Sequence, residues 1–396
     1  MIADRVNRLG TETAFAVSAE AAAFAARGNK VYPFHLGDIN LKTPTNVLEA
    51  GIKAMRDGHT NYCPNAGVAK LREILADDVG TSRDVKYSME NVAIQPGGKP
   101  TIGKFFLTMM NPGDEVLYPN PGYPIYESMI EFHGGKAVPY GYIESKNKFD
   151  IDTAMLADRI TPRTKLLVLN DLQNPTGAEC SDRELEQIAE LVLKHDLYVL
   201  SDEAYFDIRY GGQSKSLVSL PGMRERCVIL YTFSKKFAMT GWRLGAAIGP
   251  KDIIDVIIKL NVNEESCSNH FVQYAAIEGL TGDQRECRQI LDTLKERRDT
   301  VVDFLNTIDG VHCLRPNATF YLWPNVTGAM KKTGLTDYDN FRKTVLQETG
   351  VSFCTRLHFG RPLEGEDNHY IRLAYSGIDP ADIKEGLGKF KEFVEG

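Results

Sequence analysis

A lysine and an arginine that lie close together in the chain are the residues best suited to do chemistry. Lys235 follows an apolar run that ends at Thr232, and Arg243 comes eight residues after the lysine. A lysine amine in a desolvated pocket can form a Schiff base with an aldehyde. An arginine fork suits a phosphate on the same aldehyde, because it donates hydrogen bonds in pairs. The two residues indicate pyridoxal 5'-phosphate (PLP); the alternative is the solvated basic end of a helix.

Further residues could complete a PLP site. Gly97, Gly98 and Lys99 open a helical pattern and are expected at the cofactor, because backbone N–H groups there can approach a phosphate, although an ordinary glycine turn would look the same. Thr232 and Ser234 offer hydroxyl groups to that phosphate. Asp202, at the end of an apolar run, could face the pyridine nitrogen and keep it protonated, or it could instead cap a helix.

Three side chains have the chemistry to contact the cofactor ring. Asn174 and Tyr205 could hydrogen-bond its 3-oxygen, but Asn174 could also start the Asn-Pro turn and Tyr205 could be a core aromatic. The rigid loop 119–126 presents Tyr123, which we expect to stack on the ring. Tyr126 in the same loop is nearly as well explained as a hydrophobic plug.

Arg372 is the single arginine in the strand-like run 370–375, whose other members are mostly apolar. A charge at such a position is costly unless it is paired. A bidentate carboxylate ligand is therefore an attractive partner, with an internal salt bridge as the alternative.

The elements that must position these residues follow from short apolar runs and helical patterns. The runs predict seven strands, over residues 91–95, 115–118, 136–140, 165–169, 197–201, 227–231 and 245–249. Helical patterns such as 182–195 lie between several of them, which favours an α/β fold with a mostly parallel seven-stranded sheet covered by helices. Motifs that begin at 95, 170, 201 and 232 follow predicted strands, at the carboxyl edge where such sheets bind ligands.

A long charged helix, over about 285–305, leaves this region and precedes a smaller α+β pattern. We therefore expect a large domain over 46–285 and a small domain built from 1–45 and 286–396.

Composition limits the class of protein. The net charge of −7 is spread along the chain, and no basic stripe suggests nucleic acid. Seven cysteines without a CxxC pair fit a reducing compartment. The Ala-rich segment 14–26 resembles a signal peptide but is better explained as an amphipathic helix, and no run is long enough to span a membrane. A cytoplasmic enzyme is expected.

These motifs resemble the class I/II aminotransferases, PLP enzymes of fold type I that include aspartate aminotransferase. The resemblance rests on Ser-Lys-x-x-Ala-Met-x-Gly-x-Arg at 234–243, Asn-Pro-Thr-Gly from 174 and Ser-Asp-Glu-x-Tyr from 201. It selects Lys235 rather than Lys236 as the Schiff-base lysine. It also implies that Gly37, Asn174 and Arg372 hold the substrate α-carboxylate. Tyr62 would reach the phosphate of a neighbouring subunit, which makes the enzyme a homodimer with shared active sites.

The resemblance leaves the substrate open. Lys99 matches a lysine associated with the distal carboxylate of aspartate or glutamate, whereas Ala14 replaces a threonine that relatives offer to the substrate side chain. The segment 354–361 departs from the Pro-Gly turn of many relatives. Three of its side chains could add positive charge to the substrate pocket, namely Arg356, His358 and Arg361.

We predict a ping-pong transamination between an amino acid and a 2-oxo acid, with aspartate or glutamate as the favoured donor. Aromatic or alanine-type aminotransferases, and PLP-dependent carbon–sulfur lyases, share the same motifs near the cofactor. A ligand-sensing regulator on this fold would need a DNA-binding module, for which the residues before Val17 leave no room. No metal site is expected.

Overall fold

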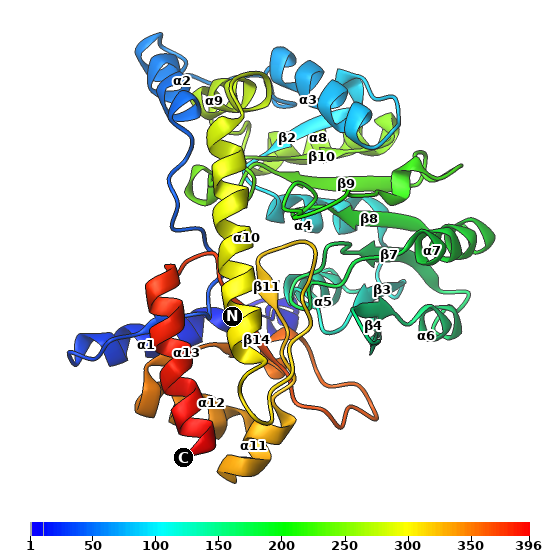
Figure 1. Cartoon of the computed structure of the whole chain (residues 1–396). Helices are drawn as coiled ribbons and strands as arrows, with labels where there is room; N and C mark the ends of the chain where they lie inside the picture. Colours follow the sequence, from blue (N-terminus) through cyan, green and yellow to red (C-terminus); the bar gives the residue numbers. More distant parts are fainter. Residues whose placement is uncertain (1, 11) are drawn as a thin grey trace.

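The computed structural model describes residues 2–10 and 12–396, and its centre is a seven-stranded sheet (Figure 1). The strand order is β2-β10-β9-β8-β7-β3-β4. The strands are β2 (Val92–Gln95), β3 (Glu115–Pro119), β4 (Lys136–Tyr140), β7 (Thr164–Leu169), β8 (Tyr198–Asp202), β9 (Cys227–Thr232) and β10 (Gly245–Ile248). Each of the seven expected strands is present, shifted by at most one residue at either end.

One strand of the sheet runs against the others. β10 lies between β2 and β9 and pairs antiparallel with both, while the remaining pairs are parallel. The start of β10 therefore lies at the same edge as the carboxyl ends of β2 and β9. Gly245 pairs there with Gln95 on one side and Thr232 on the other.

The strands bury alternate side chains on the two faces of the sheet, as period-two geometry requires. In β9, Ile229 and Tyr231 join one apolar core, whereas Val228 and Leu230 join the core on the opposite face. Helices cover both cores (Figure 1). The helices of this part are α2 (Thr45–Arg56), α3 (Ala69–Ser82), α4 (Lys99–Met109), α5 (Ile125–Phe132), α6 (Thr153–Asp158), α7 (Asp182–Lys194), α8 (Lys251–Glu264) and α9 (His270–Thr281).

Helix α7 shows why the local sequence folds as expected. Ser181 and Glu184 form a capping box that fixes its first turn. Leu185, Ile188 and Val192 lie on one face and are buried against the sheet.

The C-terminal part and the N-terminal segment share a third apolar core. The long helix α10 (Arg285–Leu305), which confirms the expected charged helix, leads from the sheet into this part and packs against α13 (Figure 1). β1 pairs in parallel with β12, which joins the two ends of the chain. Its helices are α1 (Ala14–Ala26), α11 (Thr327–Thr333), α12 (Tyr338–Thr349) and α13 (Pro380–Glu395), and its strands are β1 (Tyr32–Pro33), β11 (Tyr321–Leu322), β12 (Val351–Ser352), β13 (Cys354–Thr355) and β14 (Ile371–Ala374).

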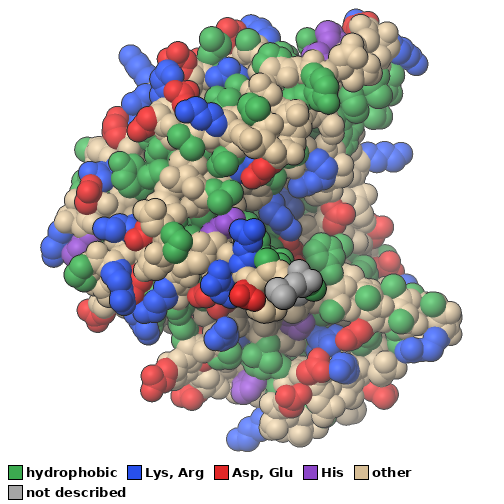
Figure 2. All heavy atoms as spheres, turned by 180° about the vertical axis from the view of Figure 1, so that it is seen from behind, with side chains coloured by type: hydrophobic (Ala, Val, Ile, Leu, Met, Phe, Trp, Pro, Cys, Tyr) green, Lys and Arg blue, Asp and Glu red, His purple; other side chains and the backbone are tan. Residues whose placement is uncertain are grey.

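The remaining elements are short. They are the hairpin of β5 (Tyr142–Glu144) and β6 (Phe149–Ile151), and the 3-10 turns η1 (Asp4–Arg8), η2 (Met89–Asn91), η3 (Leu217–Ser219), η4 (Thr240–Trp242) and η5 (Arg356–Phe359). Among the described residues, no helix is long and apolar enough to cross a membrane. On the face drawn in Figure 2, acidic and basic side chains are interspersed rather than gathered by sign.

Candidate active site

A cavity of about 570 Å³ opens where the carboxyl ends of the sheet strands meet the C-terminal part of the chain. Most of the predicted site residues line it, although they come from widely separated segments. These residues are Gly37, Gly98, Lys99, Tyr123, Asn174, Asp202, Tyr205, Thr232, Ser234, Lys235, Arg243 and Arg372. Gly97 and Tyr62 do not line this cavity.

Lys235 lies in the loop after β9, and its amine is buried in the cavity. Its Nζ lies 3.4 Å from the carbonyl oxygen of Gly37 and 5.3 Å from the ring centre of Phe320. Burial, helped by the charges of Arg372 and Arg243 and opposed by that of Asp38, lowers the pKa of Lys235 to about 8. An amine with this pKa can lose its proton and act as a nucleophile near neutral pH.

The neighbouring lysine has a different environment. The Nζ of Lys236 lies 3.3 Å from Asp207, and the side chain is outside the cavity. The geometry therefore agrees with the choice of Lys235 as the reactive lysine.

Asp202 is the last residue of β8 and is fully buried beside the cavity. Its Oδ2 accepts a hydrogen bond of 2.5 Å from the hydroxyl of Tyr126, and its Oδ1 accepts one of 3.1 Å from the backbone N–H of Ala204. Burial raises the pKa of Asp202 to about 6. Tyr126 is therefore a partner of the carboxylate rather than the hydrophobic plug that the sequence also allowed.

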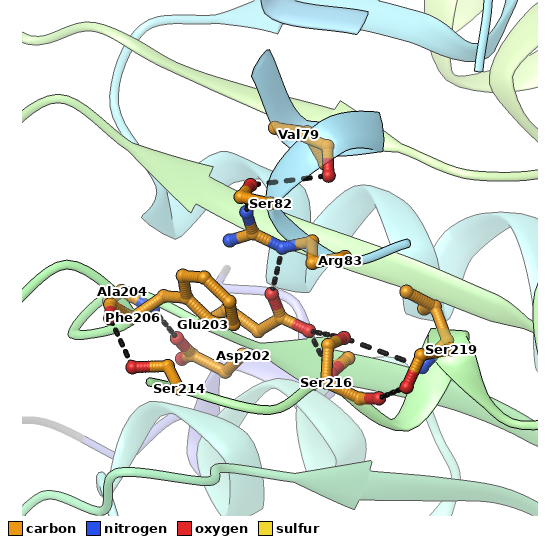
Figure 3. A network of polar contacts seen from close by, with 12 residues as sticks. Val79, Ser82, Arg83, Asp202, Glu203, Ala204, Phe206, Ser214, Ser216 and Ser219 are labelled. Carbon is orange, nitrogen blue, oxygen red and sulfur yellow. Dashed lines mark hydrogen bonds and ion pairs between the residues drawn. The ribbon is translucent and has the colours of Figure 1, made fainter. Parts of the chain in front are cut away.

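A polar network behind Asp202 fixes the end of β8 (Figure 3). The next residue, Glu203, accepts a hydrogen bond of 2.6 Å from Nε of Arg83, which follows α3, and this ion pair is almost completely buried. The other oxygen of Glu203 accepts from Ser201, at 3.0 Å, and from Ser216. The guanidinium of Arg83 also stacks 3.6 Å from the ring centre of Phe206. The end of β8 is thus tied to two other segments, the residue that follows α3 and the loop at Ser216.

Hydroxyl, backbone and guanidinium donors gather at the start of β10. Thr232 Oγ1 donates to Ser234 Oγ at 2.9 Å, and Gly98 is the N-cap residue of α4. Arg243 has a positive φ of 56°, and its Nη1 donates to the carbonyl of Thr240 at 2.8 Å. A helix N-terminus, two hydroxyls and an arginine match the groups that bind phosphate.

Gly97 has a steric role that the sequence did not indicate. Its φ is +105°, and a Cβ added there would lie 2.2 Å from Nη2 of Arg243. Glycine is therefore needed at this position so that Arg243 can reach the phosphate-binding donors at the start of β10, which together form the phosphate cradle.

Arg372, on β14, provides a cation at another part of the cavity. Its Nη1 donates to Oδ1 of Asn174 at 3.0 Å, and its Nη2 donates to the carbonyl of His35 at 2.7 Å. The buried Nε has no hydrogen-bond partner among the described residues. Since these contacts are with neutral groups, the charge of Arg372 is available to a carboxylate ligand, rather than being neutralised in the internal salt bridge that was the alternative.

Tyr321, on β11, was not foreseen as a cavity residue. Its hydroxyl lies 2.8 Å from that of Tyr205, and its ring lies 4.5 Å from the guanidinium carbon of Arg372. A Cβ on Gly37 would lie 2.0 Å from the Tyr321 oxygen, so Gly37 makes room for this tyrosine. A two-residue strand carries no periodicity that could have revealed this position.

The expected positive charge from segment 354–361 is largely absent. Arg356 is buried and pairs with Glu366 at 2.6 Å, and it does not line the cavity. Arg361 extends outward, with 91% of its side chain exposed. His358 does line the cavity, but burial lowers its pKa to about 4, so it is neutral at pH 7. The prediction that these residues add charge to the pocket is therefore wrong.

Lys99 is instead paired with a residue that the sequence did not single out. Its Nζ forms an ion pair with Oε1 of Glu12, and the same oxygen accepts a hydrogen bond of 2.6 Å from Tyr123. Glu12, Lys99 and Tyr123 all line the cavity. Ala14, the other position that bears on the substrate, lines it too.

The described residues fit PLP. A buried amine of lowered pKa, a buried carboxylate and a phosphate cradle are present together, and a buried guanidinium N–H without a partner lies nearby. Tyr62, by contrast, is 85% exposed, and its role at a neighbouring subunit stays a prediction.

Comparison with known proteins agrees with this chemistry. Residues 30–390 match the family model "Aminotransferase class I and II". The chain is 32% identical to an aspartate aminotransferase of Bacillus subtilis, covering 100% of this chain and 99% of the relative. It is also 32% identical to an asparagine–oxo-acid transaminase of Streptococcus mutans, covering 99% and 98%.

A solved structure supports the same assignment. The aspartate aminotransferase of Thermus thermophilus, determined with maleate, superposes with a TM-score of 0.90 at 28% identity over 99% of both chains. The cavity chemistry, the fold and the full-length similarity agree: the chain belongs to the class I and II aminotransferases, which are PLP-dependent enzymes.

Proposed function

We propose that this aminotransferase uses a four-carbon donor of the aspartate type, with a 2-oxo acid as acceptor, in a ping-pong reaction. The observation that carries the proposal is the cavity itself, in which the buried amine of Lys235 lies among two arginines, a lysine and a buried carboxylate. Relatives named aspartate aminotransferase and asparagine–oxo-acid transaminase support this donor class, as does the maleate in the Thermus structure, because maleate is a dicarboxylate.

Arg372 and Asn174 would hold the α-carboxylate of the substrate. The bond between their side chains fixes the guanidinium, whose charge is not neutralised by a carboxylate of the described residues. Tyr321 and Gly37 shape the cavity wall beside them.

Lys235 would hold the cofactor and then move a proton at the substrate Cα. PLP, when bound, withdraws electrons from that carbon and so acidifies its proton. Burial, which lowers the pKa of Lys235 to about 8, keeps enough of the amine neutral to accept the proton. Asp202 would face the pyridine nitrogen, held there by Tyr126, while Ser234, Thr232, Gly98 and Arg243 would bind the phosphate, and Tyr205 the 3-oxygen.

We further propose a homodimer with shared active sites, in which Tyr62 contacts the phosphate bound to the other subunit. Its 85% exposure leaves the side chain available to a second chain. The third apolar core is built mostly from 1–45 and 286–396, with Leu172, Tyr205 and Ile208 contributed by the sheet part, and this supports a division into a large domain over 46–285 and a small domain from 1–45 and 286–396. The free state of the seven cysteines supports a cytoplasmic enzyme.

Product release in a single half-reaction tests the donor. The PLP-loaded enzyme is mixed with one amino acid and no acceptor, and the oxo acid released is measured by mass spectrometry. Aspartate or asparagine should release one equivalent of its oxo acid per site and then stop until an oxo acid is added. Release from alanine or aromatic amino acids, but not from aspartate or asparagine, would overturn the donor assignment. Continuous release of pyruvate or ammonia without acceptor would indicate a lyase, which the comparisons do not favour.

A further inference from the structure

The pair of Glu12 and Lys99 places two opposite charges at the surface of the substrate cavity. Lys99 is the first residue of α4, directly after the N-cap Gly98, and half of its side chain is exposed. Glu12 is more enclosed, with 18% of its side chain exposed. The hydroxyl of Tyr123 donates to the same Glu12 oxygen at 2.6 Å, and the Lys99 amine lies 5.8 Å from the tyrosine ring centre. The carboxylate is thus held by two donors.

The segment that carries Glu12 is tied down on both sides. Before it, the N–H of Gly10 donates to Oγ of Ser128, on α5, at 2.9 Å, and the hydroxyl donates back to the Gly10 carbonyl at 3.3 Å. After it, α1 begins at Ala14. Described residues on either side of Glu12 therefore have defined positions, Gly10 against α5 and Ala14 at the start of α1.

Other charged residues line the same cavity as Glu12, namely Asp38, Asp202, Lys235, Arg243 and Arg372. His358, which also lines it, is neutral at pH 7. The negative charge of Glu12 acts on Lys235. It raises the pKa of this lysine, whereas burial lowers it by more. The carboxylate thus faces the reacting part of the cavity, and in its presence Lys99 contributes little net positive charge.

We propose that Glu12 is a specificity-determining residue that pairs with Lys99 and so competes with the distal carboxylate of a dicarboxylic substrate. Such a substrate must separate Glu12 from Lys99 or bind beside it, and either outcome weakens its binding. A substrate without a distal charge leaves the pair intact. The inference depends on the proposed function, because it concerns substrates of the aspartate type.

Equilibrium binding of unreactive acids to the PLP-loaded enzyme tests the inference without turnover. Succinate carries two carboxylates and propionate carries one. The variant Glu12→Gln should bind succinate about tenfold more tightly than the wild type in isothermal titration calorimetry, because one nearby negative charge is removed. Propionate affinity should stay the same, which also shows that the variant is folded. KM for aspartate should fall in parallel, while kcat changes much less.

Two further variants make the test specific. Asp309→Asn removes a carboxylate from an exposed ion pair with Lys332, in the C-terminal part of the chain, and should leave succinate binding unchanged. In Glu12→Gln combined with Lys99→Gln, the gain in succinate affinity should disappear, because the cation that attracts the second carboxylate has been removed.

Unchanged or weaker succinate binding by Glu12→Gln would overturn the inference, as would a gain that persists in the double variant. The proposed function fails separately. If neither aspartate nor asparagine releases an oxo acid, the donor assignment is wrong, whatever the succinate measurements show.

Discussion

At the scale of single residues, the burial of Lys235 has two effects. It makes the amine reactive, and it lowers the stability of the folded protein. The folded protein holds an amine that prefers to be neutral, since its pKa falls from 10.5 to about 8. Below pH 8 the amine is charged in both the folded and the unfolded chain, and the folded state bears the full cost of burying that charge. Between about pH 8 and 10.5 the folded state loses its proton first, and the cost declines as the pH rises.

We therefore expect Lys235→Met to stabilise the cofactor-free protein at pH 7. The shift corresponds to an upper bound of about 3 kcal/mol in the free energy of unfolding. Urea unfolding of both proteins from pH 7 to 10.5 measures the effect. The advantage of the variant should shrink across the upper part of this range, and an advantage that grew with pH would contradict the burial argument.

The adjacent lysines allow a matched chemical test. Borohydride should trap PLP on the wild-type chain and on Lys236→Ala, whereas Lys235→Ala should carry no trapped cofactor, because of the two adjacent lysines Lys235 lines the cavity and Lys236 does not. Mass spectrometry of the reduced proteins gives the result. Trapping on Lys235→Ala at the wild-type rate would disprove the assignment.

At the scale of elements, the end of β8 depends on the ion pair between Glu203 and Arg83 (Figure 3). Changing Glu203 to Leu leaves a buried arginine without its partner. We expect a loss of about 3–5 kcal/mol in the free energy of unfolding. Adding Arg83→Met should recover most of the loss, because the charge that was left unpaired is removed.

Chemical denaturation of the single and double variants measures this coupling. The exposed pair of Asp309 and Lys332 is the control, and Asp309→Asn should cost less than about 1 kcal/mol. A double variant no more stable than Glu203→Leu would show that the surrounding serines, rather than the ion pair, hold the strand end.

The same scale shows what the sequence can predict. The strands were found because runs such as 227–231 are continuously apolar and bounded by polar motifs, but periodicity carries no direction, so the antiparallel course of β10 required the structure. Arg356 was misjudged because its partner Glu366 lies in an irregular loop. Glu12 was missed because the partners that hold it at the cavity, Lys99 and Tyr123, are distant in the chain.

At the scale of the whole molecule, the cavity draws on parts of the chain that have separate cores. Asp202 ends one strand of the large sheet and Lys235 follows another, whereas Arg372 and Tyr321 belong to the small antiparallel sheet near the C-terminus. A movement of one part against the other would change the distance between the reactive amine and the group that binds the substrate carboxylate.

Shared sites in a dimer predict complementation between inactive chains. Lys235→Ala and Tyr62→Ala should each have low activity alone. In a mixed dimer, one site combines the intact Lys235 of one chain with the intact Tyr62 of the other. Co-expression should therefore restore up to half of the wild-type activity per mixed dimer, at twice the chain mass of 44.1 kDa. Sedimentation with activity assays tests this, and a dimer without recovery would place Tyr62 outside the shared site.

The pairing of Thr232 with Gly245 has a consequence for protein engineering. The twelve residues between them form a loop closed at its base, and four of its apolar side chains, Phe233, Phe237, Met239 and Leu244, are buried in the core beneath the sheet. These four buried side chains anchor the loop, and the site residues Lys235 and Arg243 lie between them in the chain. A chimera that exchanges 233–244 with a relative as one unit should retain both, whereas a boundary drawn inside the loop would separate the amine from the anchors that position it.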